Sequence, residues 1–159
     1  MTNRKITETA ALAAVSVVLG YVESLIPSAV PIPGIKLGLS NLAVLFALYR
    51  IDAKSASATV CIKIIVSALL FSGVQTIIYS AFGGFLSLLA MCAFKKLFSV
   101  KYVSIIGGIC HNIGQLAAAA LVLKSTAVLW YLPYLLLGGA LTGLLIGIVS
   151  ELFLKMPKK

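Results

Sequence analysis

Charged residues are scarce in this chain of 159 residues, and acidic residues are the scarcest of them. Only 11% of the residues are charged, with 13 Lys and Arg against 4 Asp and Glu, whereas 61% are hydrophobic. Because soluble domains carry about 25% charged residues, this composition indicates an integral membrane protein. The net charge of +9 does not predict a nucleic-acid partner, since most positive charges lie in short clusters between apolar runs, as in cytoplasmic loops.

Cysteine is also rare, and its positions exclude two kinds of site. Cys61, Cys92 and Cys110 are odd in number and lie far apart within apolar runs. They are typical of small apolar residues, and they indicate neither a disulfide framework nor a metal site. We expect no metal and no cofactor.

Six apolar runs predict an all-α, multi-pass membrane protein with a single domain, residues 1–159. The predicted helices cover residues 6–26, 37–50, 53–72, 74–94, 102–123 and 130–154. The second is only about fourteen residues, or roughly 21 Å, against a bilayer core of about 30 Å. Either this helix starts earlier, or the preceding Pro-rich segment, residues 27–36, dips into the membrane and caps a cavity.

Six spans place both termini on one side of the membrane, and the loop charges indicate which side. With the termini inside, the inner Lys and Arg residues are Arg4, Lys5, Arg50, Lys54, Lys95, Lys96, Lys101, Lys155, Lys158 and Lys159. Only Lys36 and Lys124 lie in outer loops. Since cytoplasmic loops carry the excess of Lys and Arg, both termini are predicted to be cytoplasmic.

The only histidine, His111, lies in an apolar run together with Asn112 and Gln115. On a helix these three side chains fall on one face, with Ser104 and Gly108, within an arc of about 100°. Uncharged polar groups at this depth need partners in other helices or in a ligand. Hydrogen bonding between helices is one interpretation, and a ligand site is the other.

The polar residues of the spans gather between the midplane and the outer surface, which favours a ligand site. Lys63, His111 and Asn112 lie near mid-depth, and Gln115 lies one turn further out. Towards the outer end lie Glu23, Asn41, Gln75 and Tyr79, with Lys36 in the Pro-rich loop. This distribution predicts an outward-facing cavity that the loop covers.

Lys63 is the most costly of these residues, because a lysine at mid-membrane costs about 2.5–3.5 kcal/mol on insertion scales. It either pairs with Glu23 or, together with Lys36, binds an anionic group of a small-molecule ligand. Two further patterns indicate close helix packing. Ala10 and Ala14 form a small-xxx-small pair, and residues 139–147 carry a Gly-xxx-Gly-xxx-Gly ridge.

Three segments of the chain resemble one bacterial membrane family. They are Glu-Ser-Leu-Ile-Pro at 23–27, Pro-Gly-Ile-Lys-Leu-Gly-Leu-Ser-Asn at 33–41 and Gly-Gly-Ile-Cys-His-Asn-Ile-Gly-Gln-Leu at 107–116. The family is labelled heptaprenyl diphosphate synthase component I, and also Gx transporter. The resemblance covers almost the whole chain.

More broadly, the chain is similar to the substrate-binding subunits (S-components) of energy-coupling factor (ECF) transporters. This similarity implies a six-helix bundle whose outward pocket is covered by the loop between the first two helices. It also implies that Ala10 and Ala14 match a motif that contacts a transmembrane coupling subunit, which works with ATPases. No ATP-binding motif is present in the chain, so partners would supply the energy.

The enzyme label of the family does not fit the residues. Prenyl chain elongation needs Asp-rich motifs that bind magnesium and diphosphate, and this chain has one aspartate, Asp52, in a cytoplasmic turn. We therefore expect no enzymatic activity. The first predicted function is substrate capture in the bacterial cytoplasmic membrane for uptake of a vitamin-, cofactor- or isoprenoid-related molecule. The alternative is a non-transporting membrane component of isoprenoid or quinone biosynthesis, or of flavin-linked electron transfer.

Overall fold

The computed structural model describes residues 2–25 and 38–156, and these residues form helices and no strand. The helices are α1 (Asn3–Ser24), α2 (Asn41–Arg50), α3 (Ala53–Ser67), α4 (Thr76–Phe94), α5 (Val100–Leu123) and α6 (Leu132–Lys155). A π-helical turn, η1 (Ala68–Ser72), continues α3, and a 3-10 helix, η2 (Thr126–Tyr131), leads into α6. The all-α prediction is confirmed for the described residues. The predicted covering loop, with Lys36, lies outside them.

Five helical segments are long and apolar enough to cross a membrane. They are Asn3–Ser24, Ala53–Ser72, Thr76–Phe94, Val100–Leu123 and Thr126–Lys155. By contrast α2 has ten residues, about 15 Å, which is half the thickness of a bilayer core. The five long segments indicate a multi-pass membrane protein, to which α2 adds a half-length helix.

Several helix ends differ from the prediction by a few residues, whereas the end of the third run agrees with it. The first helix begins at Asn3, where an ion pair between Arg4 and Glu8 links successive turns. The third run ends at residue 72 as predicted, because Gly73 takes a φ of 81°, a conformation that favours glycine. The second helix begins at Asn41, four residues later than predicted.

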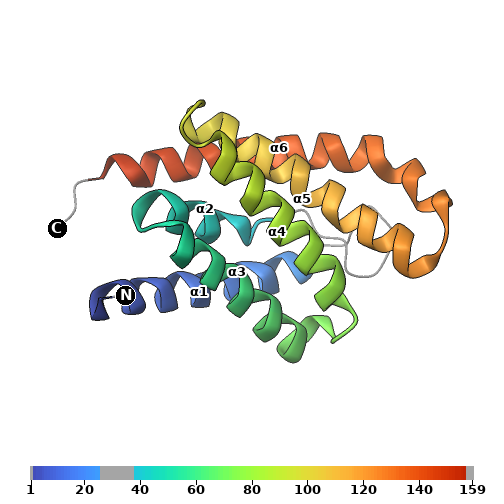
Figure 1. Ribbon diagram of the computed structural model, residues 1–159, viewed down its shortest axis with the longest axis horizontal. Coiled ribbons are helices and arrows are strands. Elements are labelled where there is room, and N and C mark those ends of the chain that lie inside the picture. The colour runs from blue at the N-terminus through green and yellow to red at the C-terminus, as the bar shows by residue number, and fades with distance from the viewer. Residues whose placement is uncertain (1, 26–37, 157–159) are drawn as a thin grey trace.

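The helices alternate in direction, so the start of α1 and the end of α6 lie at the same end of the molecule (Figure 1). The four ion pairs found among the described residues all lie at this end: Arg4–Glu8, Lys5–Asp52, Lys101–Glu151 and Lys155–Glu151. We call it the basic end. The opposite end carries few charges among the described residues, which agrees with the asymmetry of the loop charges.

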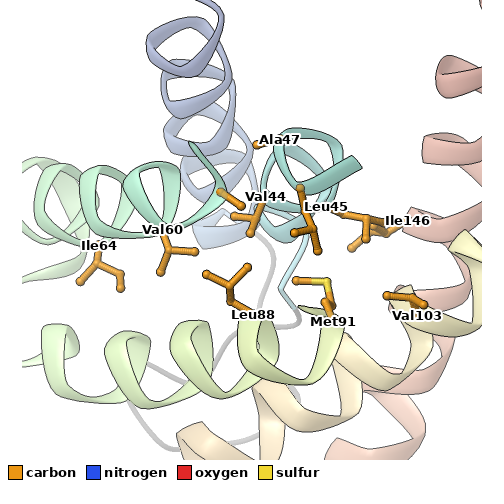
Figure 2. Close-up of a cluster of buried hydrophobic side chains, with 11 residues drawn as sticks. Val44, Leu45, Ala47, Val60, Ile64, Leu88, Met91, Val103 and Ile146 are labelled. Atoms are coloured by element: carbon orange, nitrogen blue, oxygen red, sulfur yellow. The ribbon is translucent and has the colours of Figure 1, made fainter. Parts of the chain in front are cut away.

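The short helix α2 lies at the centre of the bundle (Figures 1 and 2). Its Val44, Leu45, Ala47 and Leu48 are almost fully buried. Around them Figure 2 shows side chains from all the later helices: Val60 and Ile64 of α3, Leu88 and Met91 of α4, Val103 of α5 and Ile146 of α6. Neighbouring helices therefore enclose α2, and the backbone groups at its ends must find partners within the bundle.

Glycines bring α5 and α6 into backbone contact. A Cβ atom on Gly108 would collide with the carbonyl oxygen of Gly139, and one on Gly143 would lie 2.7 Å from that of Ser104. The predicted glycine ridge of α6 therefore packs on α5. In a bilayer this close packing replaces the hydrophobic driving force that lipid does not provide.

Candidate functional site

The segment that leads into α2, Gly38–Asn41, lies at the middle of the bundle, and we call it the entry segment. It turns sharply: the backbone N–H of Asn41 donates to the carbonyl oxygen of Gly38 at 2.9 Å. Gly38 has a φ of 93°, and a Cβ atom there would lie 3.3 Å from Cδ2 of His111. The positive φ favours glycine here, and the imidazole ring leaves little room for a Cβ atom.

Lys63 of α3 binds the side chains of the entry segment. Its Nζ donates to Oδ1 of Asn41 at 2.7 Å and to Oγ of Ser40 at 3.0 Å. The lysine side chain is only 5% exposed, so these bonds compensate much of its lost hydration. Lys63 faces the inside of the bundle, as expected for a lysine with a defined partner at mid-depth.

Helix α1 holds the backbone of the same segment. The Ser16 hydroxyl donates to the carbonyl oxygen of Ser40 at 2.9 Å, and the carboxylate of Glu23 accepts from the backbone N–H of Gly38 at 2.5 Å. Glu23 is buried. The carboxylate of α1 and the lysine of α3 thus bind the same four residues, one through the backbone and the other through side chains.

The electrostatics of this centre favour negative charge. The N-terminus of α2 carries a partial positive charge, and the Lys63 ammonium lies beside it at the first residue of the helix. Glu23 supplies one anionic group at the same segment. An anionic group of a ligand at this segment would interact favourably with two positive groups, the N-terminus of α2 and the Lys63 ammonium.

A small cavity of about 30 Å³ borders the entry segment. It is lined by Gly20, Ser40, Lys63, Ile64, Ser67, Ser80, His111 and Gln115. These residues lie from the middle of their helices towards the end opposite the basic end. The volume holds one or two water molecules, whereas small-molecule pockets are typically about 300–1,000 Å³.

The structure brings three of the four predicted mid-depth residues, Lys63, His111 and Gln115, to this one cavity. Asn112 is fully buried elsewhere: its Nδ2 donates to the Leu135 carbonyl oxygen of α6 at 2.6 Å. It links α5 to α6 because its side chain points about 100° away from that of His111 around the helix. Asn112 therefore matches the interhelical hydrogen-bonding interpretation.

The residues predicted near the cavity mouth divide in the same way. Asn41 belongs to the entry segment and Glu23 binds its backbone, but Gln75 is exposed before α4. Tyr79 packs in an apolar cluster with Leu116, Ala118, Ala119, Val128 and Leu135. Neither Gln75 nor Tyr79 lines the cavity.

Asn41 also reaches a second, smaller void of about 10 Å³ between α2, α4, α5 and α6. Its Nδ2 and the Oγ of Ser87 are buried there, and neither has a hydrogen-bond partner among the described residues. The void has room for about one water molecule, which would satisfy both groups. Asn41 thus connects Lys63 to the interior of the other half of the bundle.

Gly20, Ser40 and Ser80 also line the cavity, although the sequence did not single them out. Ser40 lies in the segment 33–41 that carries the family resemblance, whereas Gly20 and Ser80 have no distinguishing sequence signal. Ala10 and Ala14 lie far from the cavity lining, and both are exposed on the outer surface of α1.

Asp52 lies at the basic end, outside the membrane spans, and has a structural role. Its carboxylate accepts from Nζ of Lys5 and from the backbone N–H of Ser55, each at 2.8 Å. The hydrogen bond from Lys5 and the one from the Ser55 backbone hold the pKa of Asp52 well below its usual range. The residue caps α3 and ties it to the first turn of α1.

These features define a class: a small, multi-pass helical membrane protein whose central half-length helix starts in a buried polar cluster. The chain belongs to the family described as heptaprenyl diphosphate synthase component I, whose model matches residues 12–153. The matched range includes every described residue of the cavity and the entry segment, whereas Ala10 precedes it. The searches of curated proteins and of solved structures found no match.

Proposed function

We propose that this protein is an S-component-like subunit of the bacterial cytoplasmic membrane that captures a small anionic or strongly polar molecule from outside. One observation carries the proposal: the N-terminus of α2 lies in the middle of the bundle beside Lys63 and His111. Transporters commonly place the N-termini of broken helices at the bilayer midplane, where they face anionic substrate groups.

The ligand in this proposal binds between Lys63, His111 and Gln115. Lys63 supplies positive charge, Gln115 supplies directional hydrogen bonds, and His111 donates or accepts according to its tautomer. The cavity of about 30 Å³ then corresponds to an unloaded, closed form. Ser16 and Glu23 hold α1 against the entry segment. We propose that the cavity widens when these bonds break and α1 moves away.

Energy for release would come from partner subunits that dock on α1. Ala10 and Ala14 are exposed at successive turns, so a second helix can approach the backbone there. In cells that also express ECF coupling subunits, we expect Ala10→Trp/Ala14→Trp to abolish copurification with them. Ligand binding by the isolated protein should persist, because neither alanine lines the cavity.

The matched control for that pair is Ala93→Trp, the same enlargement at an exposed alanine of α4. It should leave copurification unchanged. If the α1 variant copurifies as well as wild type, coupling through this face is refuted.

We further propose that the chain crosses the membrane six times, which leaves both termini in the cytoplasm. Thr126→Cys at the start of η2 should then react with a membrane-impermeant thiol reagent applied to intact cells, and Lys96→Cys should not. Both need a background in which the three native cysteines are replaced. Labelling of position 96 from outside would reverse the orientation.

The family description and the small cavity favour a second candidate, a non-transporting membrane component of isoprenoid or quinone biosynthesis. On this account too we propose that the chain is not itself the prenyl-transferring catalyst, because Asp52 is engaged in capping α3. This candidate predicts copurification with a soluble prenyl synthase that does not depend on Ala10 and Ala14.

A further inference from the structure

A larger cavity of about 310 Å³ opens between α1 and α2 at the basic end, and we call it the basic groove. Its lining includes Arg4, Glu8, Ala11, Leu12, Phe46 and Arg50. None of these residues belongs to the polar centre around Lys63. The volume falls at the lower end of the range for small-molecule sites, about 300–1,000 Å³.

The lining changes from charged to apolar with depth. Arg4 is in the first turn of α1 and Arg50 is the last residue of α2, so both lie at the basic end. Leu12 lies about 12 Å deeper along α1 than Arg4, and Phe46 about 6 Å deeper than Arg50, at 1.5 Å per residue. The groove thus has a cationic mouth and an apolar floor.

The two arginines differ in their partners. The Nε of Arg4 donates to the Glu8 carboxylate at 2.8 Å; the Arg4 side chain is largely exposed to solvent, and that of Glu8 is partly exposed. Arg50 is half-buried and has no hydrogen bond or ion pair with any described residue. Its guanidinium is therefore available to an anion at the mouth, whereas Arg4 would have to leave Glu8.

The apolar side of the groove continues along α1 towards the other end of the bundle. Ala11, Val15, Val18, Val22 and Leu25 are exposed and fall within an arc of about 80°. Ala10 and Ala14 lie on the adjoining face, so a molecule in the groove leaves the proposed coupling face free. A hydrocarbon chain several times longer than the groove could lie along this continuous apolar surface of α1.

We propose that the basic groove binds an amphiphile with a phosphate or diphosphate head and a long hydrocarbon chain. Arg50, joined by Arg4, holds the head through paired N–H donors, which match phosphate oxygens. Ala11, Leu12 and Phe46 hold the start of the chain. Anionic phospholipids and prenyl diphosphates share this chemistry, and basic pockets between membrane helices do bind anionic lipid heads.

The test measures binding of a fluorescent farnesyl diphosphate analogue to the full-length protein in a neutral detergent. Arg50→Gln should weaken binding about tenfold, the effect of losing one charge-assisted pair. Lys96→Gln removes the same charge from an exposed site at the basic end outside the groove, and it should change affinity less than about twofold. Glu8→Gln should tighten binding, because it removes the acidic group from the groove and frees Arg4.

Ala11→Trp tests the apolar wall without changing charge, and it keeps the proposal testable if Arg50→Gln unfolds. We expect it to weaken binding about tenfold, while a thermal melt stays within a few degrees of wild type. Unlabelled farnesyl diphosphate should compete, and inorganic diphosphate and farnesol should each compete at least about tenfold less well.

Competition by dioleoyl phosphatidylglycerol separates the two sources of the ligand. If the phospholipid competes as well as farnesyl diphosphate, the ligand is a membrane lipid. If the phospholipid competes much less well, the ligand is a prenyl diphosphate. Either result supports the proposed binding site in the groove. If Arg50→Gln and Lys96→Gln lose equal affinity for the analogue, binding depends only on the overall positive charge, and the proposal is overturned. Inorganic diphosphate binding as tightly as farnesyl diphosphate would overturn it as well.

Discussion

Replacing Gly108 by alanine is expected to destabilise the bundle by about 3 kcal/mol, the upper part of the range for overpacking a rigid interior. The added Cβ would collide with the backbone oxygen of Gly139, and Asn112 packs against the same turn of α6. A backbone atom cannot rotate away as a flexible side chain can, so α5 and α6 must separate. Thermal unfolding of the purified protein in detergent measures the loss.

Gly20→Ala is the matched control for that substitution. A Cβ atom on Gly20 would meet its nearest neighbour, Oγ of Ser67, at 3.6 Å, which is ordinary van der Waals contact. Because alanine favours a helix over glycine by about 1 kcal/mol, this variant should be neutral or slightly more stable. Equal stability of Gly108→Ala and Gly20→Ala would contradict the α5–α6 packing described here.

Lys63→Met is expected to have two separate effects. It leaves Oδ1 of Asn41 buried without its donor, which should cost about 1–3 kcal/mol of stability. If the cavity binds an anionic ligand group, the substitution should also weaken that ligand by about 1.5–3 kcal/mol, the range for hydrogen bonds to charged groups. The first effect appears in thermal unfolding, and the second in ligand titration.

A double variant, Asn41→Leu/Lys63→Met, separates these effects. Removing both partners of the Lys63–Asn41 bond leaves only the Ser40 hydroxyl without the lysine. Most of the stability should therefore return, while the loss of ligand binding should remain. Recovery of ligand affinity along with stability would mean that Lys63 only supports the fold. The charge of Lys63 would then serve the entry segment alone.

The sequence predicted the long helices well because the bilayer imposes a length and a composition on each. It also predicted the glycine ridge of α6, since small residues at every fourth position have few other causes. It did not predict the position of α2. A short apolar run is equally consistent with a peripheral helix and with a helix enclosed by others, as α2 is here.

The polar residues illustrate a further limit. His111, Asn112 and Gln115 share one narrow arc of α5, and all three are buried. A buried arc of about 100° is wide enough to face two neighbouring helices. His111 and Gln115 face the cavity, but Asn112 faces α6. Periodicity predicts that a side chain is buried, and only the packing of the neighbours decides what it contacts.

Close packing of Gly38 against His111 joins two of the segments that carry the family resemblance. The first segment ends in the entry segment, and the second supplies the ring against which Gly38 packs. Their contact spans more than 70 residues of chain, so neither segment alone indicates the other. Lys63, which no motif included, joins the same cluster through Ser40 and Asn41.

If the cavity beside Lys63 binds a small molecule, native mass spectrometry of the purified protein should detect the complex. The proteins compared are wild type and Asn41→Leu/Lys63→Met, each incubated with a library of vitamins and cofactors without prenyl diphosphates, which the basic groove is proposed to bind. We expect a bound mass on wild type that is lost from the double variant and retained by Arg50→Gln, because Arg50 lines the basic groove and not this cavity. No bound mass on wild type, or one that the double variant retains equally, would contradict the proposed binding.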